Sequence, residues 1–228
     1  MAKDDRTVVP LPLIERGSIE DAHSGFGAQI GRNADLGRRA ERAVSVLMAE
    51  IRGWDSVSAV LGPERGGRLL RQAVDRALEQ VQSLGPVETS LDDVPTRPSV
   101  VATFGGDDHA VRALLAAMAL RDSLATGLHP SMKERFRASV GVNSGTIVDT
   151  DVSQGGIRYA AEGTTRMFAQ RLQEFAGPDQ VLVSAETYRA VPLRLDVTPI
   201  GGVRTNGDGE TREAYCLRGL LTDVASRF

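Results

Sequence analysis

The order of hydrophobic and polar positions predicts alternating strands and helices after residue 40. Residues 43–51 are mostly apolar, short and followed closely by a glycine, which is typical of a buried strand. From 55 to 84 apolar residues return at steps of three and four, the spacing of an amphipathic helix. Residues 1–40 mix prolines and glycines with polar residues and show neither period, so we expect an irregular or partly helical N-terminal extension.

The remainder of the chain continues the alternation. Apolar runs at 87–91 and 100–104 flank a turn with two prolines, which predicts a hairpin with a long tip. The further predicted elements are a helix at 109–125, a strand pair at 138–142 and 146–148 around Asn143-Ser144-Gly145, a helix at 163–175, a strand at 181–183, a short helix at 185–190 and a last strand at 214–217. This order predicts an α+β fold, a mainly antiparallel sheet with helices on one face.

Composition narrows the function classes. The chain has 228 residues, 41% of them hydrophobic and 25% charged, as in ordinary globular domains. A formal net charge of -3 argues against nucleic acid or an acidic membrane surface as a partner. Cys216 is the single cysteine, so a disulfide framework and a cysteine zinc site are excluded. The longest apolar run, 114–120, is far shorter than the roughly 20 residues of a membrane helix. We therefore expect a cytoplasmic protein without membrane insertion.

A series of short blocks runs in order along most of the chain. The blocks are VLMAEIRGW at 46–54, LGPE at 61–64, VVATFG at 100–105, DHAVRA at 108–113, VGVNSG at 140–145, the stretch from Tyr159 to Gly163 leading to Arg171-Leu172, and VLVS at 181–184 before Thr187-Tyr188. In order and spacing they resemble the class III adenylyl and guanylyl cyclases. The resemblance implies a ferredoxin-like βαββαβ fold, with a cyclase-homology domain at 41–219 and a C-terminal tail at 220–228.

The resemblance also implies a metal site, which this sequence changes. Such cyclases close a nucleoside triphosphate into a 3',5'-cyclic monophosphate with two metal ions, Mg²⁺ or Mn²⁺, held by two aspartates. Glu50 stands at the first position, and its longer side chain shifts the carboxylate by roughly 1 Å, a displacement that can cost about a hundredfold in rate. The second position falls on Pro98 when counted back from Phe104, or on Asp93 when counted forward from Gly85. We favour loss of this ligand.

The positions that would read the base and hold the ribose and phosphates are altered too. Val94 or Thr89, depending on the alignment, replaces the lysine that reads adenine in adenylyl cyclases, and Thr164 matches the second base-reading residue. Met167 and Arg171 stand where the family has an asparagine and an arginine one helical turn apart. Losing such a donor typically costs roughly a hundred to a thousandfold. Arg171 could grip phosphate, or form an ordinary surface salt bridge.

The turn after the first strand is the remaining candidate. It consists of Ile51, Arg52, Gly53 and Trp54, and its backbone N–H groups could face a triphosphate. Packing of the Trp54 ring against the sheet is the alternative role for that side chain.

The changes together favour a degenerate, inactive cyclase-homology protein, a pseudoenzyme acting as a regulatory dimerisation or nucleotide-binding module in cyclic-nucleotide signalling. The family resemblance implies a head-to-tail homodimer, or pairing with another cyclase-type domain. One alternative is a divergent active cyclase that uses Glu50, Asp93 and Arg171 with Mg²⁺ or Mn²⁺. The other is a structural dimerisation module that binds no ligand.

Overall fold

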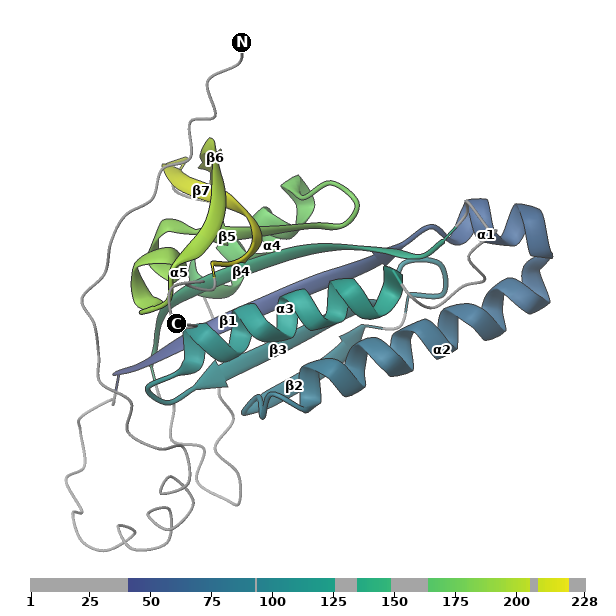
Figure 1. Ribbon diagram of the computed structural model, residues 1–228, viewed down its shortest axis with the longest axis horizontal. Helices are drawn as coiled ribbons and strands as arrows, with labels where there is room; N and C mark the ends of the chain where they lie inside the picture. The colour runs from purple at the N-terminus through teal and green to yellow at the C-terminus, as the bar shows by residue number, and fades with distance from the viewer. Residues whose placement is uncertain (1–40, 93, 126–134, 149–163, 206–208, 222–228) are drawn as a thin grey trace, which may run out of the picture.

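A computed structural model describes residues 41–92, 94–125, 135–148, 164–205 and 209–221 (Figure 1). The predicted extension at 1–40 and nearly all of the predicted tail at 220–228 lie outside these residues. The elements are β1 (Glu41–Arg52), α1 (Trp54–Leu61), α2 (Pro63–Gln82), β2 (Glu88–Asp92), β3 (Ser99–Gly105), α3 (His109–Ala125), β4 (Arg137–Val148), α4 (Thr164–Phe175), β5 (Gln180–Ser184), α5 (Ala185–Ala190), β6 (Leu195–Arg204) and β7 (Thr211–Leu220).

The strands form one sheet in the order β2-β3-β1-β4-β5-β7-β6. All neighbouring pairs are antiparallel except β4 and β5. The first four strands, connected by the α1–α2 segment, the β2–β3 hairpin and α3, have the order of a ferredoxin-like βαββαβ unit. The predicted α+β fold with a mainly antiparallel sheet is confirmed.

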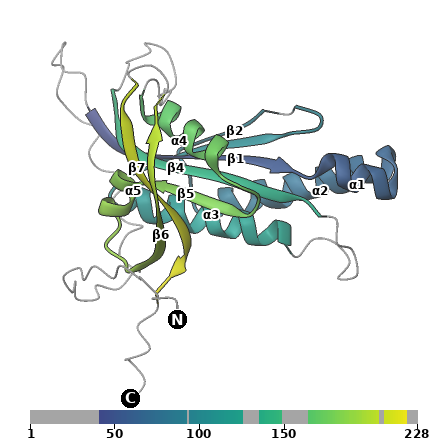
Figure 2. The same ribbon diagram turned by 90° about the horizontal axis from the view of Figure 1, so that it is seen from above.

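The two faces of the sheet are covered differently. Leu47 and Ala49 of β1 belong to the main core, which α2 and α3 cover, whereas Val44 and Val46 belong to a smaller cluster that includes Ala169 of α4. Figure 2 shows α3 and α4 on opposite sides of the strands. The expectation of helices on one face therefore holds for α2 and α3, and α4 is the exception.

Gly141 explains why α4 can lie so close to the sheet. A Cβ atom added to Gly141 would lie 2.2 Å from the carbonyl oxygen of Ala169 and 2.4 Å from the backbone nitrogen of Gln173. Only a residue without a side chain leaves room for the helix backbone at that point. Gly141 of β4 therefore lets the helix backbone approach the second face of the sheet closely.

The predicted strand pair around Asn143-Ser144-Gly145 is wrong, because residues 137–148 form one continuous strand. These residues pair with Val46, Ser45 and Val44 of β1 rather than forming a turn. The polar side chains that suggested a turn have buried partners instead, since Asn143 Nδ2 donates to the Thr165 carbonyl at 2.9 Å.

The predicted helix at 55–84 and the region before the last strand also differ from expectation. Gly62, with φ of 80°, ends α1, and Pro63 begins α2, so the segment forms two helices. We did not predict β6, in which Pro199 and Gly201 accompany a β-bulge. Within the part of the chain that the structure describes, no helix has the length and apolar character needed to cross a bilayer.

Candidate functional site

Glu50 lies near the carboxyl end of β1, on the sheet face that α4 contacts. It stands opposite Ser99 of β3 and Ser139 of β4. Directly opposite residues of antiparallel strands share a face, so the three side chains are neighbours. The Glu50 side chain is 13% exposed and belongs to the surface of this face rather than to the core under α2 and α3.

Two arginines bind the same carboxylate oxygen of Glu50. Oε1 accepts a hydrogen bond from Arg52 Nε at 2.7 Å, and two from Arg97, from Nη2 at 2.7 Å and from Nε at 3.1 Å. Arg52 is the last residue of β1, and Arg97 lies in the connection between β2 and β3. Hydrogen bonds between ionised partners are among the stronger ones in proteins. The expected first metal ligand is thus neutralised by side chains of its own chain.

The side chains around Glu50 do not form a binding site for a divalent cation. Mg²⁺ and similar ions need several converging oxygen ligands. The described ranges of the chain contain no group of three or more His, Cys, Asp or Glu side chains placed to share a metal ion. Glu50 offers one carboxylate, which already has two cationic partners. Asp93, the alternative second ligand, lies outside the described residues.

The hairpin tip docks on the end of β1 through Pro98. Pro98 is buried, and its carbonyl accepts a hydrogen bond from the Ile51 N–H at 2.9 Å. This contact gives the Ile51 N–H a partner within the protein, so it is not free to bind a triphosphate. The same docking holds Arg97 beside Glu50, while Val94 of the tip is 44% exposed.

The turn between β1 and α1 is shaped by Gly53. Its φ is +111°, a conformation that favours glycine, and an added Cβ would lie 2.6 Å from the carbonyl oxygen of Arg135. The Trp54 ring lies over Gly66 and Gly67 of α2, so the tryptophan packs on a helix. Trp54 also borders a cavity of about 530 Å³ between α2 and the β2–β3 hairpin, which Leu70 of the main core lines too.

Arg171 and Met167 lie on α4, but Arg171 is engaged within its own neighbourhood. Its Nε donates to the Arg204 carbonyl of β6 at 3.2 Å, and its Nη1 pairs with Glu174 at 2.9 Å. The guanidinium also stacks over Phe175, 5.1 Å from the ring centre. These contacts match the surface salt bridge that was the alternative to phosphate binding by Arg171. Met167 is 46% exposed and therefore not a core residue.

The two threonines lie in different surroundings. Thr89 of β2 stands opposite Ala102 of β3, and Ala102 belongs to the core under α2 and α3. Thr89 therefore shares the face opposite to that of Glu50. Thr164 is exposed and begins α4, on the Glu50 side of the sheet. The structure does not bring Thr89 and Glu50 together.

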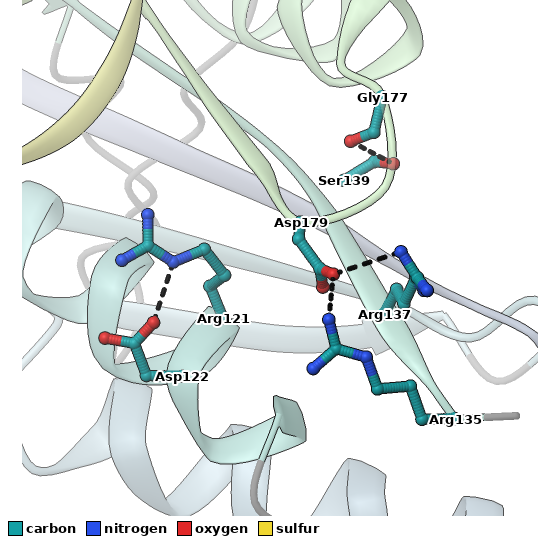
Figure 3. A network of polar contacts seen from close by, with 7 residues as sticks. All are labelled: Arg121, Asp122, Arg135, Arg137, Ser139, Gly177 and Asp179. Carbon is teal, nitrogen blue, oxygen red and sulfur yellow. Dashed lines mark hydrogen bonds and ion pairs between the residues drawn. The ribbon is translucent and has the colours of Figure 1, made fainter. Parts of the chain in front are cut away.

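A second ion-pair group lies at the same end of the sheet and was not predicted (Figure 3). Asp179 Oδ2 accepts from Arg135 Nη2 at 2.7 Å and from Arg137 Nη1 at 3.4 Å. Arg137 stands directly opposite Arg52 on β1, so this group and the Glu50 group are adjacent. No local pattern could reveal it, because its members come from separate segments that only the strand register brings together.

Comparison with protein families decides the affiliation. The model of the adenylate and guanylate cyclase catalytic domain matches residues 39–219. The chain belongs to this cyclase family. No curated protein sequence matches the chain.

Solved cyclase structures share the fold at low sequence identity. The adenylyl cyclase CyaB from P. aeruginosa is 19% identical with a TM-score of 0.64, covering 81% of this chain and 98% of that one. The guanylate cyclase domain of RhGC from Catenaria anguillulae, solved in complex with GTP, is 16% identical with a TM-score of 0.62, covering 80% and 100%. A guanylyl cyclase domain from Blastocladiella emersonii, described as a non-canonical dimer, is 15% identical with a TM-score of 0.61, covering 80% and 99%.

Proposed function

We propose that this cyclase-family domain is catalytically inactive and serves as a regulatory dimerisation or nucleotide-binding module in cyclic-nucleotide signalling. The proposal covers a domain at 41–219 in a cytoplasmic protein. It rests on family membership together with the side chains that occupy the positions expected to carry the chemistry.

The observation that carries the proposal is the pairing of Glu50 with Arg52 and Arg97. Three N–H groups converge on Glu50 Oε1 within 3.1 Å. A divalent cation bound there would have to displace two guanidinium groups and would gain one carboxylate in return. Metal-assisted cyclisation needs the cation to neutralise the triphosphate and activate the ribose hydroxyl. The ion pair supports loss of that step.

The helix α4 supports the same conclusion independently. Met167 replaces the asparagine that the family resemblance implies, and a thioether cannot donate a hydrogen bond to the ribose. Arg171, one turn later, gives donors to Arg204 and Glu174. A transition state would therefore lack one donor and would have to draw the other from existing partners, which predicts a loss of at least a hundredfold.

We further propose that the domain forms a head-to-tail homodimer or pairs with another cyclase-type domain. The head-to-tail arrangement rests on the resemblance, which implies that the family builds each site from two domains. The Blastocladiella emersonii relative, described as a non-canonical dimer, supports self-association alone. Sedimentation across a wide concentration range tests this part. A monomer at every concentration, alone and with a cyclase-type partner, would contradict it.

The central test incubates the full chain with Mg²⁺ or Mn²⁺ and each of ATP, GTP, CTP and UTP. Cyclic product is measured by chromatography, with an active adenylyl cyclase as the assay control, and thermal unfolding is followed in the same mixtures. We expect no product above background, together with a nucleotide-dependent rise in the melting temperature. A shift without product supports a binding module, whereas no shift and a stable dimer favour the purely structural module.

Two variants make the outcome specific. Glu50→Gln keeps the shape of the side chain but removes its charge, and Glu79→Gln is the matched change on the exposed surface of α2. Product that is lost in Glu50→Gln and kept in Glu79→Gln would refute inactivity. It would establish the divergent active cyclase, with Glu50, Asp93 and Arg171 as its candidate residues.

A further inference from the structure

Arginine side chains gather at the end of the sheet that carries Glu50. Arg52 and Arg137 stand directly opposite each other on β1 and β4. Like charges in such positions repel each other, and this costs stability unless an anion lies between or beside them. Arg97 adds a third guanidinium through its contact with Glu50. Positive charge is therefore concentrated where the resemblance implied divalent cations.

Among the described residues, the carboxylates at this end of the sheet do not balance the arginines. Glu50 and Asp179 are the acidic members of the two ion-pair groups. The guanidinium groups that contact them are those of Arg52, Arg97, Arg135 and Arg137. Among the described strand residues on this face, the next acidic one is Asp92, which stands opposite Ser99, two strands from Glu50 and about 10 Å away at the usual strand spacing. Within the described part of the sheet, the ion pairs thus leave a positive excess around Glu50.

The arginines also keep hydrogen-bond donors beyond those that the carboxylates use. A guanidinium has five N–H groups, and Arg97 gives two of them to Glu50. The Arg97 side chain is 62% exposed, and that of Arg137 is 44% exposed with a long contact of 3.4 Å to Asp179. Both side chains can therefore offer donors to a ligand in solvent without breaking a buried contact.

We propose that this arginine cluster, Arg52, Arg97 and Arg137, binds the phosphate chain of a nucleoside triphosphate directly and without a divalent cation. The inference deepens the proposed function, because it states how the same face holds its nucleotide. Guanidinium groups match phosphate oxygens in charge and geometry, and they form two parallel hydrogen bonds to one phosphate group. The arginines thus supply positive charge at a position where the described residues do not form a metal site.

The test measures binding of inorganic tripolyphosphate, ATP and GTP by calorimetry, first in EDTA and then with Mg²⁺. We expect all three to bind in EDTA, with ATP or GTP at least as tight as tripolyphosphate. Affinity should fall as salt is added and should fall again with Mg²⁺, because the ion neutralises part of the phosphate charge. Binding that requires Mg²⁺, or none in EDTA, would overturn the proposal, and so would binding of tripolyphosphate alone.

Variants show whether these arginines carry the binding. The double change Arg97→Gln with Arg137→Gln should weaken affinity in EDTA at least about tenfold, since hydrogen bonds to charged groups are lost. Arg218→Gln is the matched control on β7, where Arg218 donates to Thr198 and is exposed. An unchanged affinity in the double variant, with folding verified by circular dichroism, would refute the assignment. Cyclic product in the enzyme assay would refute inactivity but leave binding in EDTA unaffected, so the two failures are distinguishable.

Discussion

His109 Nδ1 lies 2.8 Å from the hydroxyl oxygen of Ser45, and both groups are buried on the sheet face that α3 covers. His109 is the first residue of α3 and Ser45 belongs to β1. The pair begins a chain of hydroxyl groups that crosses the sheet to the start of α5. This chain lies on the opposite face from Glu50, so it acts on the stability of the scaffold rather than on the candidate site.

The direction of these hydrogen bonds predicts which nitrogen of His109 carries the proton. The Val142 carbonyl can only accept, so Thr187 donates to it, and Ser144 donates to Thr187. Ser144 has no second proton, so Ser45 must donate to Ser144, and Nδ1 of His109 must donate to Ser45. Nitrogen NMR of the imidazole should show a protonated Nδ1 at neutral pH. A protonated Nε2 with a bare Nδ1 would contradict this order.

The same histidine predicts a loss of stability in mild acid. Burial, and then the nearby Arg112, lower the pKa of His109 below its usual 6.5, although Asp108 and Asp107 act in the opposite direction. The unfolded chain therefore takes up the proton first as pH falls through about 6.5, so the free energy of unfolding decreases toward lower pH. Above about pH 6.5, His109 is neutral in both the folded and the unfolded chain, so it does not change the free energy of unfolding. Below the lowered pKa it is protonated in both, and the loss in free energy of unfolding has reached its full size.

The variant His109→Asn isolates this effect, because an amide can replace the Nδ1 donor but does not titrate. Urea unfolding from pH 5 to 7.5 should show the wild type losing stability relative to the variant as the pH falls. At neutral pH the variant should differ by about 1 kcal/mol, the size of one altered hydrogen bond. A difference that is constant across the pH range would exclude His109 as the titrating group.

The hydroxyl chain also shows where sequence patterns succeed and fail for the fold. Periodicity located α3 at 109–125, and apolar runs located the hairpin strands, because the signal for each of these elements lies within one short window of the sequence. Local patterns failed at Asn143-Ser144-Gly145, whose residue types favour turns. The stabilising partners, Thr165 for Asn143 and Ser45 for Ser144, lie far away in the sequence. Local preference was overridden by contacts that no short window contains.

For the candidate site too, the sequence predicts residues in contiguous segments but not contacts between distant segments. Glu50 could be found from the sequence, because the family blocks around it are contiguous. Its partner Arg97 could not, since their contact depends on the strand register that joins Ile51 to Pro98. Arg137 likewise becomes a candidate only once β4 is paired with β1, which places it opposite Arg52. In an arginine-rich chain no single arginine stands out until the fold places it.

Gly141 should be the least replaceable glycine in the sheet. In Gly141→Ala the new methyl group would meet the backbone of α4 at Ala169 and Gln173, which cannot move without shifting the helix. We expect a loss of about 3 kcal/mol in the free energy of unfolding, as for severe overpacking. Gly219→Ala is the control, because nothing lies within 4 Å of its added Cβ. Equal urea midpoints for the two variants would show that α4 does not pack tightly against Gly141.

Asp179 combines an ion-pair role with an unusual backbone, and substitutions can separate the two. Its φ of 64° lies in the left-handed region, and its N–H donates to the Ala138 carbonyl at 2.7 Å. Asn and Gly both tolerate this conformation, whereas Ala carries a cost of about 1–2 kcal/mol. The bonds to Arg135 and Arg137 are partly exposed and should contribute about 0.5–1 kcal/mol. We therefore expect Asp179→Asn and Asp179→Gly to lose only that smaller amount in urea unfolding, and Asp179→Ala to lose the sum of both. If Ala and Gly lost the same amount, the left-handed turn would not be a constraint, and the ion pairs alone would explain the aspartate.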